Sequence, residues 1–284
     1  MFFYFSHVLF YAIIVFIITL RKGLTQAMSI LKQIILHAAP LPQLENCNRF
    51  LFIGPHPDDI EIGAGATAAK LAAAGKELCF LICTDGRYGF DNLSEPITPE
   101  QLADIRRKEA LSAAKVLGVS DVRFANLSDG AFYDVEELSH VILKTISDFQ
   151  PEVILCPDPS VTSECHSDHL NAGNAAKRAA CFASNREIMK AHGLTAAPVQ
   201  AIAFFMTAKP NRYIRTDGFL QTQLDSIFLC HTSQFPAGTS WAKSMSLYLK
   251  LRAYDFGLRS LCKTAEGFRV LGQTHMHCLP EAGD

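Results

Sequence analysis

From Arg49 onward, short hydrophobic runs alternate with longer segments whose apolar positions recur every three or four residues. The short runs have the length expected of β-strands, whereas the longer segments have the period of amphipathic helices. Strands and helices that alternate in this way are typical of a parallel sheet with helices on both faces. The pattern predicts strands over 50–54, 77–84, 121–125, 152–156 and 200–206, and helices over 63–74, 99–117 and 168–183, with another helix starting at Asp134.

Two of the predicted helices begin with specific capping sequences. Thr98-Pro-Glu-Gln101 supplies a capping hydroxyl, a proline in the first turn and a glutamine three residues after the cap, and Asp134-Val-Glu-Glu137 repeats the pattern. We expect the last third of the chain to be helical, including residues 241–258. The fold class is therefore predicted to be α/β, a Rossmann-like three-layer sandwich with a mostly parallel sheet.

The N-terminal segment differs in composition from the rest of the chain. Residues 2–20 carry no formal charge and are about long enough to cross a bilayer. Arg21 and Lys22 follow, and positive charge on this side favours a membrane anchor with the following domain in the cytoplasm. Two alternatives are translation from Met28, which would give a soluble cytoplasmic protein, and an apolar helix that lies on the membrane. The expected organisation is an apolar membrane helix over 1–22, a connector over 23–48 and one folded domain over 49–284.

Charge and cysteine content narrow the classes of function. The chain has 26 basic and 28 acidic residues, a net charge of -2, so nothing in the overall charge favours a nucleic-acid partner. The nine cysteines form no C-x-x-C motif and lie largely in hydrophobic runs, as reduced thiols in a protein core do. The sequence does not fix the oligomeric state.

Residues 50–71, FLFIGPHPDDIEIGAGATAAKL, contain two competing motifs. Gly63 and Gly65 imitate the glycine-rich loop of a dinucleotide-binding fold, in which the first glycine directly follows the first strand. Here Gly63 comes nine residues after Gly54, where the predicted strand ends, and a polar segment lies between them. We therefore expect these small residues to allow close packing of a helix on the sheet, and we expect the chemistry to lie in the polar segment.

The polar segment has the residue types of a metal site. His56, Asp58 and Asp59 follow the first strand, at the sheet edge where open α/β folds bind their ligands. His166 and His169 stand three residues apart at the start of the helix that follows the strand at 152–156. A catalytic zinc needs three such ligands and an open position for water. The alternative is a polar loop whose histidines cap a helix.

These motifs resemble those of the PIG-L/LmbE-like zinc-dependent N-deacetylases, in which PHPDDIEIGAGAT and HSDH correspond to the two metal motifs. LICTDGRYG, RRKEALSAAKVLGV, NLSDGAF, HTSQF and AEGF extend the resemblance in order from about residue 49 to 270. The resemblance implies that His56, Asp59 and His169 bind zinc. It also implies that Asp58 is the general base, and that His166 stabilises the oxyanion and protonates the leaving amine. Asp168 would orient His166.

The resemblance also suggests residues for substrate binding. Arg106 matches an arginine that commonly contacts substrate, although its neighbour Arg107 and a role as a solvated helix charge are alternatives. Asp129 could bind sugar hydroxyls or form a turn.

Other positions are open or depart from the family pattern. His231 and Gln234 in HTSQF could close the pocket or end a helix, and we expect His275 and His277 to lie in a mobile tail. The family pattern often has glutamate at Ile60 and proline at Ser167, so loop packing and the aim of His166 are in question.

The predicted function is a zinc-dependent hydrolase that removes an N-acetyl group from an N-acetylglucosamine-type conjugate, either a soluble sugar or a glycolipid. A site of two histidines and one carboxylate can also hold Fe²⁺. One alternative is a zinc amidase or esterase that acts on a non-sugar substrate. Another is a sugar-binding or nucleotide-binding module without turnover, which would need neither Asp58 nor His166.

Overall fold

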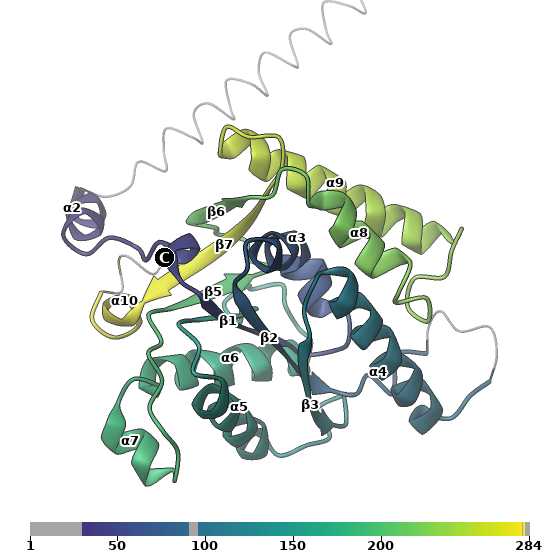
Figure 1. Cartoon of the computed structure of the whole chain (residues 1–284), viewed down its shortest axis with the longest axis horizontal. Coiled ribbons are helices and arrows are strands. Elements are labelled where there is room, and N and C mark those ends of the chain that lie inside the picture. Colours follow the sequence, from purple (N-terminus) through teal and green to yellow (C-terminus); the bar gives the residue numbers. More distant parts are fainter. Residues whose placement is uncertain (1–29, 91–95, 280, 282–284) are drawn as a thin grey trace, which may run out of the picture.

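A central β-sheet of seven strands organises the part of the chain that the computed structural model describes, residues 30–90, 96–279 and 281 (Figure 1). The strands are β1 (Arg49–Gly54), β2 (Glu77–Thr84), β3 (Asp121–Leu127), β4 (Val153–Pro157), β5 (Ala201–Phe205), β6 (Arg212–Arg215) and β7 (Ala265–Gly272). Their order across the sheet is β3-β2-β1-β4-β5-β7-β6. Strands β1 to β5 are parallel, whereas β7 is antiparallel to both β5 and β6. The predicted α/β architecture with a mostly parallel sheet is confirmed.

Helices cover both faces of this sheet (Figure 1). They are α2 (Ile30–Ala38), the 3-10 turn η1 (Leu44–Asn46), α3 (Asp59–Ala73), α4 (Pro99–Val116), α5 (Val135–Phe149), α6 (Ser167–Phe182), α7 (Arg186–Ala191), α8 (Leu220–Phe228), α9 (Ser240–Arg259) and α10 (Gln273–His277). Side chains of a strand point alternately to the two faces of its sheet. Accordingly, Phe50 and Phe52 pack with α3 and α4, and Leu51 and Ile53 pack with α5 and α6. Burial on both faces explains why the strands read as continuous hydrophobic runs.

The capping sequences start helices where predicted. The Thr98 hydroxyl accepts a hydrogen bond from the Gln101 amide at 3.3 Å, and the Gln101 side chain accepts one from the Thr98 amide at 2.8 Å. Asp134 accepts from the Glu136 amide at 2.9 Å at the start of α5. These bonds satisfy amides that have no partner within the helix itself.

Two predictions about secondary structure were wrong. The helix expected over 63–74 begins earlier, at Asp59, with non-helical backbone at Ala64. The C-terminal third is not wholly helical, because it contributes β6 and β7. Strand β7 is buried along its whole length although it contains Glu266 and Arg269. These charged residues interrupt the hydrophobic pattern of a buried strand, and each is hydrogen-bonded to a residue in a distant part of the chain. Gly63 does lie against the ring of Phe205, which agrees with the expected close packing of helix on sheet.

The membrane anchor expected over residues 2–20 lies outside the described residues. Among the residues that are described, no helix has both the length and the apolar character needed to cross a membrane. Within the connector expected over 23–48, helix α2 ends two residues before Pro40.

All nine cysteines are free thiols, as predicted. Burial raises the pKa of Cys83 and Cys156, so these two thiols are protonated and pack as small hydrophobic residues.

Candidate active site

The first site motif occupies the turn between β1 and α3. The His56 amide donates to Asp59 Oδ2 at 2.9 Å, which folds the turn back on itself. Asp58 precedes the helix with φ 130° and ψ −24°, a strained conformation for a residue with a side chain. Ile60, which replaces the glutamate of the family pattern, is fully buried against Gly54 and serves packing.

The second motif begins α6, directly after the loop that follows β4. His166 caps this helix, because its Nδ1 accepts a hydrogen bond from the Asp168 amide at 3.3 Å. His169 lies in the first helical turn. Ser167 starts the helix without the proline of the family pattern, so the cap bond holds the orientation of His166 that a fixed proline φ would otherwise favour.

The two motifs meet because β1 and β4 are neighbours in the sheet and end at the same edge. Asp59 Oδ2 lies 3.1 Å from His56 Nδ1 and 3.3 Å from His169 Nε2. One donor atom from each of these three residues can be chosen so that all lie within 4.8 Å of one another. Two imidazoles and one carboxylate in this arrangement are the ligand set of a catalytic zinc or a non-haem iron.

The outer nitrogen of each histidine has its own carboxylate partner. His56 Nε2 lies 3.1 Å from Asp168 Oδ2, and His169 Nδ1 lies 3.0 Å from Glu164 Oε2. Such partners fix the tautomer and the ring orientation of metal-binding histidines and are the usual outer layer of a metal site. Because the inner nitrogens are turned toward Asp59, the residues present fit a divalent metal ion.

The charges around this triad favour a bound cation. Burial alone would raise the pKa of Asp59, but His169 and His56 more than offset it and hold that pKa well below its usual range. Burial opposes protonation of His56, yet its bonds to Asp168 and Asp59 raise its pKa to about 10. The carboxylates that favour protons on these buried imidazoles would also favour a metal ion in place of those protons.

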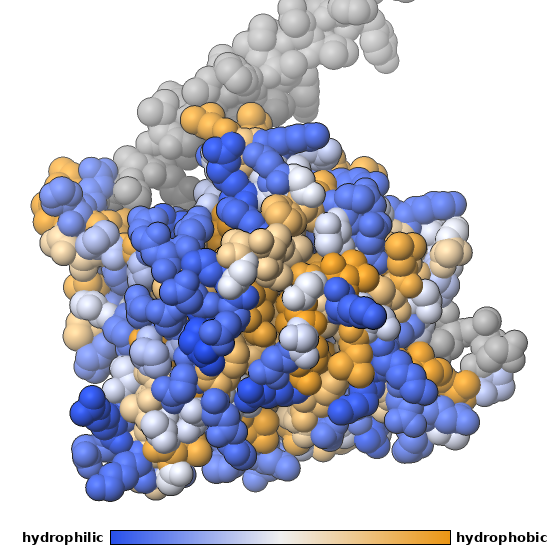
Figure 2. Space-filling view, viewed as in Figure 1, coloured by the Kyte–Doolittle hydropathy of each residue, from blue (hydrophilic) through white to orange (hydrophobic). Residues whose placement is uncertain are grey.

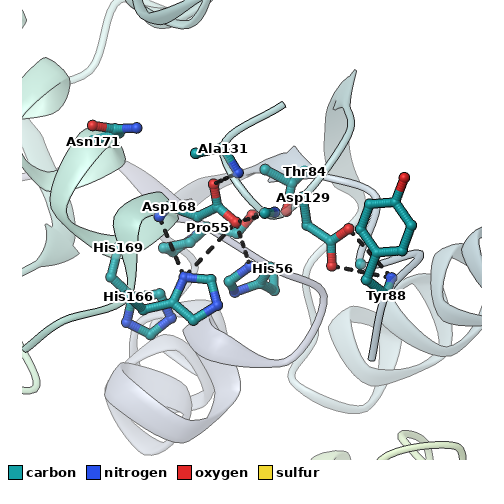
Figure 3. A network of polar contacts seen from close by, with 12 residues as sticks. Pro55, His56, Thr84, Tyr88, Asp129, Ala131, His166, Asp168, His169 and Asn171 are labelled. Carbon is teal, nitrogen blue, oxygen red and sulfur yellow. Dashed lines mark hydrogen bonds and ion pairs between the residues drawn. The ribbon is translucent and has the colours of Figure 1, made fainter. Parts of the chain in front are cut away.

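Asp168, which was predicted to orient His166, has several other contacts. It is completely buried and accepts hydrogen bonds from the amides of Gly130 and Ala131, at 2.8 and 2.9 Å. Its Oδ2 lies closer to His56 Nε2 than to His166 Nδ1, which is 3.8 Å away. Burial raises the pKa of Asp168, but these partners lower it to about 2. The carboxylate is therefore ionised and holds the two motifs together (Figure 3).

His166 is the most accessible member of the group. Its ring centre lies 4.7 Å from that of His56 and 5.1 Å from that of His169, and half of its side chain is exposed. Burial and the neighbouring imidazoles lower the pKa of His166. Figure 3 shows its ring beside the predicted ligands, where it can reach a molecule bound at the metal position.

The buried side chain of Arg106 contacts Asp58. Its Nη2 donates to Asp58 Oδ2 at 3.1 Å and to the Pro57 carbonyl at 2.8 Å, while Nη1 donates to the Gly86 carbonyl at 3.1 Å. Burial raises the pKa of Asp58 to about 6, and Arg106 opposes that rise. Arg107 instead stacks on the Phe124 ring, so of the two adjacent arginines it is Arg106 that contacts Asp58.

Asp129 is buried and binds the loop that follows β2, and its predicted roles in sugar binding or turn formation stay predictions. Both of its carboxyl oxygens lie 3.3 Å from the Tyr88 amide, which donates to them, and burial raises its pKa. The turn that follows supplies the two amides that bind Asp168 (Figure 3).

The HTSQF segment contacts α3 and the loop that follows β2. His231 is fully buried with Nε2 3.7 Å from Glu61 Oε1, and Gln234 donates to the Gly89 carbonyl at 3.0 Å. The segment therefore contributes to the support of the site. His275 was expected in a mobile tail, but it is buried and lies 2.9 Å from the Ala39 carbonyl, so that prediction was wrong.

Glu164, Glu61 and Glu109 contribute to the site but were not identified from the sequence. Glu164 stands two residues before His166, and Glu61 stands two residues after Asp59. Glu109 lies one helical turn after Arg106, on the same face of α4. Their positions close to the motifs in the sequence could have identified them.

Comparisons with known proteins agree with this geometry. Residues 51–180 match the family model PIG-L, described as GlcNAc-PI de-N-acetylase. The diacetylchitobiose deacetylase of Thermococcus kodakarensis is 32% identical over 238 residues, which cover 82% of this chain and 87% of that protein. The chain therefore belongs to the PIG-L family of deacetylases.

Two further relatives cover different amounts of the chain. The solved N,N'-diacetylchitobiose deacetylase of Pyrococcus horikoshii superposes with a TM-score of 0.75 at 27% identity, covering 92% of this chain and 96% of that one. A 1D-myo-inositol 2-acetamido-2-deoxy-alpha-D-glucopyranoside deacetylase of Kineococcus radiotolerans is 30% identical over 208 residues, covering 62% of this chain and 56% of that protein. The two diacetylchitobiose deacetylases thus match over most of both chains.

Proposed function

We propose that this protein is a metal-dependent hydrolase that removes the N-acetyl group from an N-acetylglucosamine-type conjugate and releases acetate and a free amine. The observation that carries the proposal is the convergence of His56, Asp59 and His169 on one position, with Asp58 and His166 beside it. Simple binding of a sugar requires neither a buried carboxylate nor an accessible imidazole beside a metal. Family membership supports the deacetylase activity.

The proposed metal is zinc, with Fe²⁺ as the alternative, held by His56, Asp59 and His169. When bound, such an ion makes a water molecule more acidic and polarises an amide carbonyl. Asp168 and Glu164 keep the two imidazoles turned toward it.

The remaining roles follow from position. Asp58 is directly adjacent to Asp59 and accepts the proton of the attacking water as general base. His166 is open to solvent, so it can donate a hydrogen bond to the acetamide oxygen, where negative charge develops, and a proton to the leaving nitrogen. Water adds to the carbonyl carbon, the carbon–nitrogen bond breaks, and the amine leaves with the proton from His166. Arg106 fixes the Asp58 carboxylate in place.

The substrate class rests on the relatives. They are named for diacetylchitobiose and for an acetylated glucosaminyl inositol, both of which carry an acetamido sugar. We therefore propose that the substrate is a soluble or lipid-linked acetamido sugar. Its acetyl group is the part that the site attacks. A non-sugar amide or ester would require the same metal site and would differ only in the groups that contact the rest of the substrate.

The test is amine release from a panel of N-acetylglucosaminyl conjugates, soluble and lipid-linked, with non-sugar acetamides and acetate esters beside them. Asp58→Asn is the control variant, because it keeps the shape of the side chain and removes the base. Turnover of sugar conjugates that this variant loses, while it still binds one equivalent of zinc, supports the proposal. Turnover of the non-sugar compounds alone would contradict the sugar assignment.

Membrane anchoring through residues 2–20, with the catalytic domain in the cytoplasm, is a separate part of the proposal. Its support is the absence of formal charge over that segment and the basic Arg21 and Lys22 after it. We expect the full chain to resist extraction from membranes by alkaline carbonate. A chain started at Met28 is the matched comparison, and equal extraction of the two would contradict the anchor.

A further inference from the structure

The outward face of α9 is hydrophobic. Leu247, Leu251 and Leu258 are 57%, 60% and 76% exposed. Together with Tyr254 they are spaced four, three and four residues apart, so they form one line along the helix. The buried residues of the same helix are Ala242, Leu249, Ala253, Phe256 and Gly257. Helix α9 is therefore hydrophobic on two opposite faces, and the described fold covers only one of them.

Basic and aromatic residues border this outward face. Lys243 and Lys250 lie along one side of it and Arg259 lies on the other, all exposed. The single acidic residue of α9, Asp255, is paired with Arg259 at 2.7 Å. Figure 2 shows hydrophobic residues at the upper edge of the molecule, where Figure 1 places one end of α9, with hydrophilic residues directly beside them. An apolar line flanked by lysine and arginine can insert among lipid acyl chains while its cations meet anionic headgroups.

The aromatic residues of α9 fit the same environment. Tyr248 and Tyr254 are about half exposed, and Trp241, at the start of the helix, stacks on Phe235 with ring centres 6.1 Å apart. Tryptophan and tyrosine concentrate at the level of lipid headgroups because each has an apolar ring and a polar group. A hollow of about 260 Å³ beside Tyr254 also has Lys250 and Lys263 in its lining, so cations are available where a phosphate would lie.

We propose that the outward face of α9 docks on an anionic phospholipid surface. Leu247, Leu251 and Leu258 enter the headgroup region, and Lys243 and Lys250 contact lipid phosphates. Charge decides between this partner and a second copy of the chain. An isologous contact would place this basic face against itself, with Asp255 already neutralised by Arg259, whereas anionic lipid complements it.

The inward side of α9 contacts α3. The Arg252 side chain of α9 donates to the Gly63 carbonyl of α3 at 3.1 Å. Helix α3 begins with Asp59, one of the three proposed metal ligands. The helix that faces the lipid thus directly contacts the helix that carries the site.

Trp241 is the only tryptophan of the chain, so its fluorescence reports on α9 alone. The experiment adds the full chain to vesicles of phosphatidylcholine, or of equimolar phosphatidylcholine and phosphatidylserine, with and without brominated acyl chains. We expect a blue shift and quenching by brominated lipid on the anionic vesicles. Both should be lost in Leu247→Ser/Leu251→Ser/Leu258→Ser. In Lys243→Gln/Lys250→Gln, quenching should fall to the level seen on neutral vesicles.

The matched control is Leu111→Ser/Val116→Ser/Phe182→Ser, which changes exposed hydrophobic residues of α4 and α6 and should behave as the unmodified chain. Unchanged Trp241 emission on anionic vesicles would overturn the proposal, even if another segment carries the protein to the vesicles. A blue shift without vesicles that grows with protein concentration would assign the face to a second copy and would overturn it equally. Neither readout depends on turnover.

Discussion

Replacing Gly86 with alanine tests whether Arg106 supports Asp58. Gly86 has φ +68°, a left-handed conformation that favours glycine, and a Cβ there would press on the Arg106 guanidinium. Gly75 has nearly the same backbone, φ +73°, with no atom within 4 Å of the position of a Cβ. Gly75→Ala is therefore a matched control that introduces the same backbone strain without the contact.

The two variants should differ by the energy of the Arg106 contacts. Gly75→Ala is expected to cost about 1–2 kcal/mol, the cost of a left-handed residue that has a side chain. Gly86→Ala carries the same cost and also displaces a buried guanidinium that bonds to the Pro57 carbonyl and to Asp58. Removing the partner of a buried charge costs about 3 kcal/mol or more, so we expect a total of about 4–5 kcal/mol.

Urea unfolding of the two variants and of the unmodified chain measures the free energies of unfolding. Turnover of the best substrate, at a urea concentration where the variant is still folded, measures the effect on Asp58. We expect Gly75→Ala to keep its activity and Gly86→Ala to lose most of it. Equal stability and equal activity in the two variants would refute the conclusion that the Arg106 contacts position Asp58.

Three further predictions concern the base, the metal and a buried ion pair. Asp58→Asn should abolish amine release while zinc binding, measured by chelator competition, persists. Glu164→Ala should weaken zinc binding about 10–100-fold, with Glu187→Ala unchanged as control. Burial raises the pKa of Asp158, but Arg269 and other partners lower it more, so the net pKa is below the usual value. The pair therefore stabilises the fold at neutral pH, and this stabilisation is lost as the pH falls through the lowered pKa. Asp158→Asn should therefore cost about 3 kcal/mol at neutral pH and less at about pH 3, measured by urea unfolding.

The parallel part of the sheet could be predicted because its strands are buried on both faces. Continuous hydrophobic runs of strand length, separated by amphipathic helices, leave little choice of architecture. Strand β7 could not be recognised in the same way, since Glu266 and Arg269 interrupt its hydrophobic pattern. Their burial is possible only because partners arrive from distant segments, including Thr67 and Asp158. A window of sequence does not contain that information.

The site was predictable where its chemistry is local. Asp58 and Asp59 follow one strand and His169 follows another, and the rule that parallel strands end at one edge brings them together. The outer contacts were less accessible. Asp168 was expected to orient His166, yet its shorter contact is with His56, which is 112 positions away in the sequence. Such a pairing depends on the positions of two loops, and spacing along the chain does not give it.

Helix α4 shows how such a site is supported by residues that need not touch the substrate. Arg106 and Glu109 are three residues apart and face the same way. Arg106 holds Asp58, while Glu109 accepts bonds from Thr232 and Ser233, at 2.6 to 3.0 Å, in the segment that follows His231. Both side chains are buried, so each must keep its partners or leave a charge without compensation. One helix face thus couples the loop of the proposed base to a distant segment, and substitutions on this face should impair catalysis through the position of Asp58.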